Sequence, residues 1–221
     1  GEACSERLWK TLRSIANHVV KIWRSPDKGI WEVRGAEEHF VHSKVMCWVA
    51  LDRAIKIAAA YGFAGEVEAW EQERDAIREA VFSRGWSETK QSFTQSFEDE
   101  ALDVSVLLMP VLGFIDGRDP KMLSTIEAVE RELSCGDGLL RRYRTDDGLP
   151  GEEGAFLLAS FWLVDALVFA GRQERAEVLY QKLVDLANET GLYSEEINPD
   201  NKEFLVKFPQ AFTHIGLINS A

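Results

Sequence analysis

"KGIWEVRGAEEHFVHSKVMCWVALDRAI", Lys28–Ile55, changes abruptly from a polar loop to an apolar helix. The loop part is rich in glycine and acids, and it places Trp31 directly before Glu32. The second part opens a predicted helix over residues 39–61, whose apolar side chains spread over much of the helix circumference. Because a helix that is apolar nearly all round is buried nearly all round, this stretch predicts an enclosed helix in a layered helical fold.

Helical periodicity recurs along the whole chain, with almost no strand signal. Helices that are apolar along one stripe are predicted at roughly 6–23, 66–82, 121–134 and 173–188. Helices that are apolar on most sides alternate with them, at roughly 39–61, 100–114, 154–170 and 209–221. This alternation predicts an all-α array of antiparallel hairpins, an (α/α) toroid with an outer and an inner layer. We expect the inner layer to include Val45–Ile57, Leu102–Leu112 and Phe156–Val168.

The lengths of the predicted loops carry a second signal. Loops that lead from a striped helix to an apolar one are long, at residues 24–38, 83–99, 135–153 and 189–208. The loops between them are short. Because alternate loops of an up-down array lie on the same face, we expect the four long loops to share one rim. Structureless loops longer than about 12–15 residues are usually functional, so a site is predicted there.

The four long loops carry aromatic residues, glycines and acids. Aromatic faces stack on the C–H faces of sugars, while carboxylates and guanidiniums hydrogen-bond to hydroxyl groups. Two carboxylates can also hydrolyse a glycoside, one as general acid and one as general base. The alternative interpretation of any single charge here is a solvated acidic loop.

Composition excludes several classes of function. With 221 residues, 46% of them hydrophobic, the chain can form a packed globular domain. Its net charge of -12 disfavours binding to nucleic acid or to anionic membranes but is compatible with a neutral substrate. No apolar run approaches the ~20 residues of a membrane span. Motifs of esterases, P-loop NTPases and zinc proteases are absent from the sequence.

Neither a metal site nor a cofactor is expected. Cys4, Cys47 and Cys135 form no CxxC pair, which argues against zinc and disulfides and favours a reducing cytoplasm. His39 and His42 have a spacing that could bind metal, but no third ligand is apparent, and a packing role is favoured.

Three groups of residues together resemble glycoside hydrolase family 15, the family of glucoamylases, glucodextranases and bacterial-type trehalases. They are "GIWEVRG" with "HFVHSKVMCWVALDRAI", "RRYRTDDGLPGEEGAFLLASFWLVDAL", and "GLYSEEI" with "FPQAFTHIGL". The resemblance implies an (α/α)6 barrel of twelve helices, of which the eight predicted here would be the fifth to twelfth. Residues 1–221 are then expected to be a partial catalytic domain, its C-terminal two-thirds, which needs the N-terminal part.

The resemblance also implies roles for particular residues. Glu32 matches the general acid of the family and Glu195 the general base, while Trp31, Arg142 and Tyr143 match residues around the sugar. The implied activity is hydrolysis of an α-glucosidic bond in a disaccharide or oligosaccharide, with inversion. The alternatives are a non-catalytic carbohydrate-binding or regulatory toroid, or an inactive fragment of the enzyme.

Some side chains of the same stretches keep two interpretations. Glu196 competes with Glu195 for the role of base. One interpretation of Glu153, as of Glu152, is that it stabilises the N-terminus of the following helix through the helix dipole. The other interpretation of Glu153 is contact with a sugar hydroxyl. Lys44 either reaches the site or is solvated.

The inverting mechanism sets a geometric expectation. It needs a water molecule between the base and the anomeric carbon, so the two carboxyl groups are expected to stand about 6.5–9.5 Å apart. A general acid must be protonated near neutral pH, and a dry setting raises the pKa of a carboxyl group. Because Glu32 follows Trp31, we expect Glu32 to be drier than Glu195.

Overall fold

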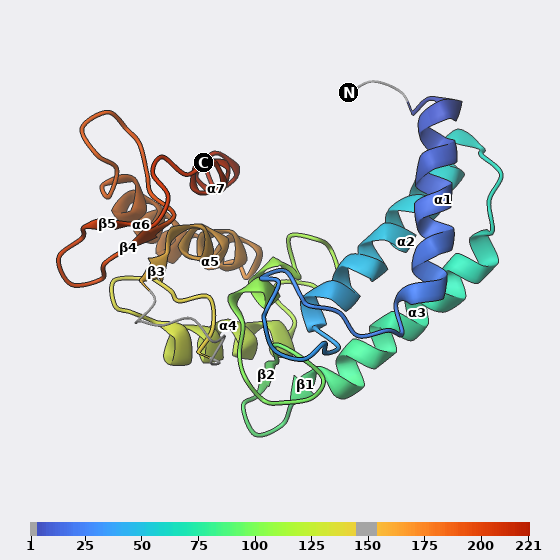
Figure 1. Ribbon diagram of the computed structural model, residues 1–221, viewed down its shortest axis with the longest axis horizontal. Helices are drawn as coiled ribbons and strands as arrows, with labels where there is room; N and C mark the ends of the chain where they lie inside the picture. The colour runs from blue at the N-terminus through green and yellow to red at the C-terminus, as the bar shows by residue number, and fades with distance from the viewer. Residues whose placement is uncertain (1–3, 145–153) are drawn as a thin grey trace. The chain divides into compact units, whose positions relative to one another are not determined.

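The computed structural model describes residues 4–144 and 154–221. Within these ranges the protein is predominantly helical, with only two-residue strands between the helices (Figure 1). This confirms the all-α prediction. The described backbone forms two compact units. The first comprises the described residues of Gly1–Trp86 and Ser96–Glu98, and the second comprises those of Ser87–Gln95 and Asp99–Ala221.

Three long helices build the first unit: α1 (Glu6–Ile22), α2 (Val41–Tyr61) and α3 (Val67–Arg84). They lie side by side, in blue to green in Figure 1, and each contacts the other two. Two buried indoles, Trp9 and Trp70, pack edge to face with their ring centroids 5.9 Å apart. All three helices agree closely with the predicted ranges.

Helix α2 is buried on one face rather than all round. Val45, Trp48 and Leu51 are in the core, where α1 and α3 cover the helix. Met46 is 42% exposed and Tyr61 is also exposed. The prediction of a helix enclosed on every side is therefore wrong for the described part of the chain, because its helical neighbours cover only one side of α2.

The second unit is built around α5 (Leu157–Phe169), which contacts α4 (Pro120–Leu133), α6 (Gln173–Val184) and α7 (Ala211–Asn219). From Leu157 to Leu167, most side chains of α5 are buried. Here the all-round apolarity does correspond to an enclosed helix.

The predicted helix over residues 100–114 is wrong. The structure has only a short 3-10 helix there, η1 (Val104–Leu108), which Asp103 caps through a hydrogen bond from the Ser105 backbone N–H. Pro110 explains the difference, because proline has no N–H to donate and its ring clashes with the carbonyl four residues earlier, here that of Val106. Leu102, Val104 and Leu107 are nevertheless buried.

Short strands join the long loops of the second unit. Three of them, β3 (Ala155–Phe156), β4 (Glu196–Ile197) and β5 (Phe204–Leu205), form an antiparallel sheet in the order β3-β4-β5. Phe156 pairs with Glu196, which pairs with Leu205. The sheet therefore joins the residues that directly follow the third predicted loop to the fourth predicted loop. The other two strands are β1 (Trp86–Ser87) and β2 (Ser92–Phe93).

In the first unit, the residues directly after the first predicted loop meet the end of the second predicted loop. The backbone N–H of Phe97 donates to the carbonyl oxygen of His39 at 3.1 Å, and Phe40 forms a β-bridge with Ser96. The prediction that all four long loops share one rim spans both units and stays a prediction.

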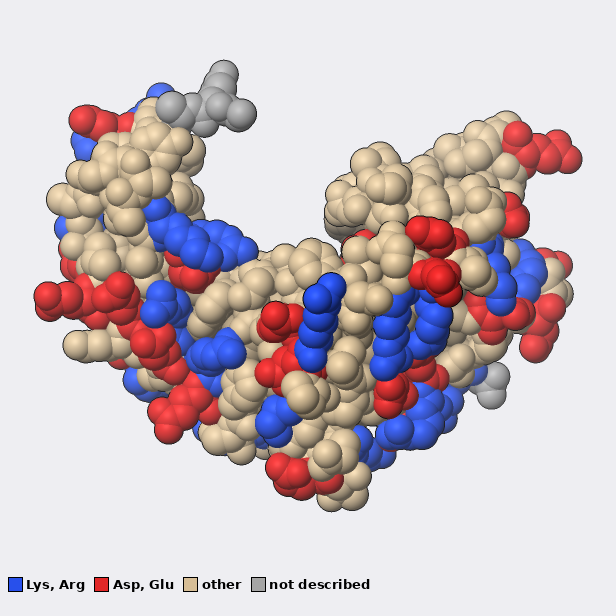
Figure 2. Space-filling view, turned by 180° about the vertical axis from the view of Figure 1, so that it is seen from behind, with Lys and Arg blue, Asp and Glu red and all other residues tan. Residues whose placement is uncertain are grey.

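The surface carries both signs of charge. Figure 2 shows acidic and basic side chains interspersed over the visible face. Among the described residues, no helix combines the length and the apolarity that crossing a bilayer requires.

Candidate functional site

Glu32 lies in a loop of the first unit that is closed at its base. Asp27 and Glu38 exchange two backbone hydrogen bonds of 2.9 and 3.0 Å. Inside the loop, the Val33 N–H donates to the Lys28 carbonyl oxygen at 3.1 Å. Glu32 itself has a left-handed backbone, with φ at 52°. Residues other than glycine rarely adopt that conformation, so the surrounding contacts must hold it.

Phe40 packs directly on this loop. Its ring lies over Gly29, where an added Cβ would stand 2.9 Å from the Phe40 Cγ atom. The φ of Gly29 is +69°, which also favours glycine. Gly29 is therefore required both by its own backbone and by the aromatic ring above it.

The expectation that Glu32 is drier than Glu195 is wrong. Glu32 is exposed, and Trp31 beside it is only half-buried, so the indole does not shield the carboxyl group within its own unit. The side chain of Glu195 is 15% exposed.

Lys44 is buried at the base of this loop, where it forms a polar cluster with the half-buried Asp27 and Ser43. Lys44 is 2% exposed, and its Nζ donates to the Ser25 carbonyl oxygen at 2.6 Å and lies 3.7 Å from Asp27 Oδ2. Asp27 Oδ1 accepts hydrogen bonds from the Gly29 backbone N–H at 2.7 Å and from Ser43 Oγ at 2.6 Å. Burial lowers the pKa of Lys44, and Asp27 opposes that change. The interpretation of Lys44 as a solvated side chain is thus wrong.

Sequence reasoning missed Asp27 and Ser43. A signal for Asp27 was present, since an Asp two residues before a Gly is typical of a turn in which the carboxylate accepts the backbone N–H two positions on. Ser43 offered no such signal, because its partner is sixteen residues away in the chain.

His39 has a packing role, as the sequence favoured. Its ring stacks on Phe97 with centroids 5.9 Å apart, and its backbone N–H donates to Glu98 Oε2 at 2.9 Å. Burial lowers the pKa of His39. In the parts of the chain that the structure describes, no group of three or more His, Cys, Asp or Glu side chains could hold a metal ion.

In the second unit, Glu196 is tied into the framework. It is 5% exposed, its Oε1 accepts a hydrogen bond from Arg142 Nη2 at 3.0 Å, and its Oε2 accepts one from the Gly154 backbone N–H at 3.1 Å. The Arg142 guanidinium also lies over the Phe156 ring, 5.1 Å from its centroid. These contacts connect the third and fourth long loops and fix the position of Arg142.

Glu195, one position earlier, is bound differently. Its backbone is held, since its N–H donates to the Lys207 carbonyl oxygen at 2.8 Å and its carbonyl oxygen accepts from the Leu157 N–H at 3.2 Å. Its carboxylate Oε2 is buried and has no hydrogen-bond partner among the described residues, while Lys207 Nζ stands 4.0 Å away. A buried polar atom without a partner is costly, and a water molecule or a substrate hydroxyl is the kind of partner that such an atom takes.

The remaining predicted contacts to sugar are placed as follows. Arg142 binds Glu196, so the segments that carry Arg142 and Glu195 lie next to each other in the second unit. Tyr143 is buried and its backbone pairs with Asp103. Trp31 lies in the first unit. Glu153 falls outside the described residues, as does Glu152.

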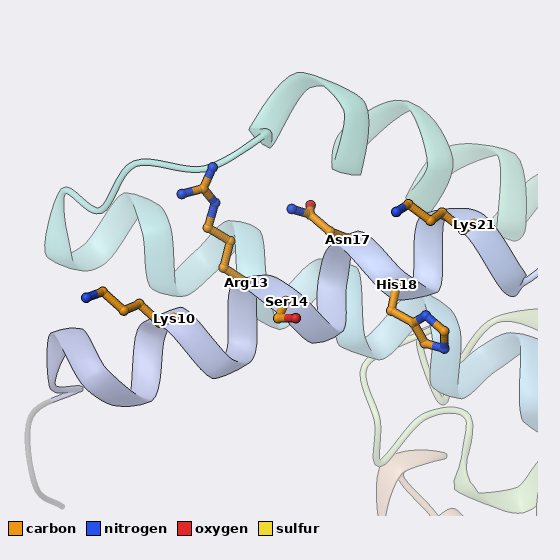
Figure 3. A pocket seen from close by; sticks show the side chains of 6 residues that line it. All are labelled: Lys10, Arg13, Ser14, Asn17, His18 and Lys21. Atoms are coloured by element: carbon orange, nitrogen blue, oxygen red, sulfur yellow. The ribbon is translucent and has the colours of Figure 1, made fainter.

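Three of the cavities formed by the described residues lie elsewhere on the two units. A cavity of about 400 Å³ runs along α1 and is lined by Lys10, Arg13, Ser14, Asn17, His18 and Lys21 (Figure 3). Two more, of about 570 and 330 Å³, lie against α6 in the second unit. None of the three is lined by a predicted site residue. The α1 cavity has basic and polar walls without the aromatic faces that sugars stack on.

A match to Glycosyl hydrolases family 15 covers residues 1–221, the whole chain. The chain belongs to this family. It is 46% identical over 222 aligned residues to the trehalase of Mycobacterium tuberculosis, covering 99% of this chain and 32% of that protein. It is 37% identical to the trehalase of Thermoplasma acidophilum, covering 100% of this chain and 38% of that one. The chain thus spans about a third of the length of these relatives.

Solved structures of the same family show the fold. A bacterial glucoamylase in complex with acarbose superposes with a TM-score of 0.77 at 17% identity, covering 97% of this chain and 37% of that chain. The family 15 glucoamylase of Hypocrea jecorina gives 0.73 at 14% identity, covering 96% of this chain and 46% of that one. The chain therefore has part of the (α/α)6 toroid fold of these glucoamylases, as the resemblance implied.

Proposed function

We propose that the protein hydrolyses an α-glucosidic bond with inversion of the anomeric configuration, and that trehalose is its substrate. The observation that carries the proposal is the identity to relatives named trehalase, which extends over the whole chain in both bacterial and archaeal sequences. Residues 1–221 are part of the catalytic domain in this proposal. The length of the relatives supports a need for further chain to complete it.

Glu195 is the general base. The base must take a proton from the attacking water, so it needs an oxygen that no protein group occupies. Oε2 of Glu195 fits this requirement, since it is buried and accepts no hydrogen bond from the described residues. Both carboxylate oxygens of Glu196 are engaged by Arg142 and Gly154, which supports a structural role for Glu196 and favours Glu195 as the base.

Glu32 is the general acid. The acid must hold its proton close to the glycosidic oxygen, so its backbone must be fixed. The closed base of the loop and the left-handed conformation of Glu32 support this role. In the free chain Glu32 is exposed, as an acid that has to reach a substrate can be.

The sugar is held by Trp31, Arg142, Tyr143 and Glu153 in this proposal. Arg142 is the best supported of the four, because Glu196 and Phe156 orient its guanidinium. A fixed guanidinium presents several N–H donors in a rigid plane, which suits the hydroxyl groups of a sugar. No cofactor takes part. The three cysteines are free, which supports a reducing, cytoplasmic setting.

The test uses the full-length protein with trehalose, maltose and isomaltose as alternative substrates. We expect glucose release to be fastest from trehalose. Glu32→Gln and Glu195→Gln should each lower kcat by about 10²–10⁴, the usual contribution of general acid–base catalysis. A wild-type protein that binds these sugars without cleaving them would identify a carbohydrate-binding module instead. Full activity of Glu195→Gln would exclude Glu195 as the base.

A further inference from the structure

We propose that Lys44 is a positioning residue for the general acid, which it serves by fixing the base of the loop that carries Glu32. The inference rests on the proposed role of Glu32. Lys44 acts through Ser25 and Asp27, with which its ammonium group makes the contacts that the structure records.

Lys44 connects separate parts of the chain around this loop. It lies in the first turn of α2, whereas Ser25 lies just beyond the end of α1. Its Nζ donates to the Ser25 carbonyl oxygen at 2.6 Å and lies 3.7 Å from Asp27 Oδ2. Lys44 thereby ties the first residues of the loop, Ser25 and Asp27, to α2, the helix that follows the loop.

Asp27 carries this constraint into the loop. Its Oδ1 accepts from the Gly29 N–H and from Ser43 Oγ, and its backbone pairs with Glu38 on the opposite side of the loop. A single carboxylate therefore connects Lys44, the turn before Trp31 and the start of α2. Displacement of Asp27 would loosen each of these contacts together.

The burial of Lys44 argues against a role in solubility or simple core filling. Only 2% of the residue is exposed. A buried ammonium is costly unless it is paired and hydrogen-bonded, and an apolar side chain of similar length would fill the same space without that cost. The contacts that the ammonium makes are the feature that a methionine could not supply.

Glu32 is sensitive to the base of its loop because its φ of 52° is an uncommon conformation for a glutamate. Such a backbone persists only where its surroundings determine it. If the base loosens, the loop can relax toward a commoner φ and carry the carboxyl group with it. A misplacement of about 1 Å at a reacting group can cost about 10²-fold in rate.

The experiment compares Lys44→Met with Lys44→Arg in the full-length protein. Lys56→Met is the matched control, because it is the same substitution on the same helix at a side chain that is 66% exposed. Two substrates are used, trehalose and α-glucosyl fluoride. Both need water activated by the base, but fluoride leaves with the electron pair of the C–F bond without needing a proton. A displaced acid should therefore slow trehalose cleavage far more than fluoride release.

We expect Lys44→Met to lower kcat on trehalose by about 10–10²-fold with KM little changed, and to affect α-glucosyl fluoride much less. Lys44→Arg should recover part of the loss, and Lys56→Met should behave as wild type. Ser43→Ala removes one hydrogen bond to Asp27 and should give the same pattern more weakly, so it serves if Lys44→Met does not fold.

Two results would overturn the proposal: wild-type rates on trehalose in Lys44→Met, or, in a folded variant, equal losses on both substrates. If Lys44→Met does not fold, unchanged activity in Ser43→Ala overturns it in the same way. Glu32→Gln is measured in parallel to separate this inference from the proposed function. If Glu32→Gln cleaves trehalose normally, the assignment of the acid itself is wrong. A second outcome is that Glu32→Gln loses trehalose cleavage but keeps fluoride release, while Lys44→Met cleaves trehalose at the wild-type rate. In that case Glu32 is the acid and only the role of Lys44 is wrong.

Discussion

Glu196→Gln should destabilise the protein and Glu195→Gln should not, although the two residues are adjacent and the substitution is the same. Glu196 is 5% exposed and accepts hydrogen bonds of 3.0 and 3.1 Å from Arg142 and Gly154, one on each carboxylate oxygen. An amide keeps only one oxygen. Either Arg142 or Gly154 would then face an NH2 group in place of an acceptor.

The cost follows from these contacts. Losing a hydrogen bond to a charged group costs about 1.5–3 kcal/mol. Because the Arg142 side chain is 20% exposed and water can replace part of the loss, we expect the lower half of that range, about 2 kcal/mol, in the free energy of unfolding. The Glu195 carboxylate receives no hydrogen bond at Oε2 from the described residues, so we expect Glu195→Gln to change stability by less than about 0.5 kcal/mol.

The assay measures the Tm and the trehalose kcat of both variants in the full-length protein. Glu196→Gln should lower the Tm. Glu195→Gln should keep the wild-type Tm while kcat falls by about 10²–10⁴. Equal Tm losses in the two variants would refute the distinction between a structural and a reactive carboxylate. So would a normal kcat in a folded Glu195→Gln protein.

Two further predictions concern the first unit. Gly29→Ala should lower the urea midpoint of the protein by the equivalent of about 1–2 kcal/mol, the cost of a left-handed alanine, and more if Phe40 cannot move from an added Cβ 2.9 Å away. Gly35→Ala in the same loop is the control and should have little effect, since nothing lies within 4 Å of its added Cβ; equal midpoints for the two variants would contradict the account. Arg13 and Asn17 hydrogen-bond the Glu66 carboxylate and lower its pKa from 4.5 to about 2, so their contribution is complete above pH 4.5 and is lost as pH falls toward 2. The Tm difference between wild type and Arg13→Met should therefore shrink across this window, and a difference that stays constant down to pH 2 would disprove the assigned pKa.

The long helices could be predicted from the sequence because each repeats its apolar pattern over several turns. The ranges expected for α1, α2 and α3 agree with the structure within a few residues. The segment around Val104–Leu108 could not be assigned by apolarity alone. Its side chains are as buried as those of a core helix, but Pro110 removes the backbone hydrogen bond that a helix would need there.

The candidate site was predictable in its residue types but not in its connections. Glu195 and Glu196 are adjacent acids in the linear pattern, and they are separated by hydrogen bonds to Glu196 from Arg142 and Gly154, which lie far away in the chain. Lys44 presents a similar case, since a charged residue on a helix is normally solvated. Its ammonium group is paired with Ser25 and Asp27, which lie in the turn after α1. The sequence of α2, which carries Lys44, gives no sign of these partners.

The most direct test of the proposed reaction is proton NMR of the glucose first released from trehalose by the full-length protein, recorded before mutarotation. Inversion at one of the two anomeric carbons should give one β-glucose, while the departing glucose stays α, so both anomers should appear together in equal amounts. Release of α-glucose alone would mean retention, and Glu195 would then have to act as a nucleophile instead of activating water.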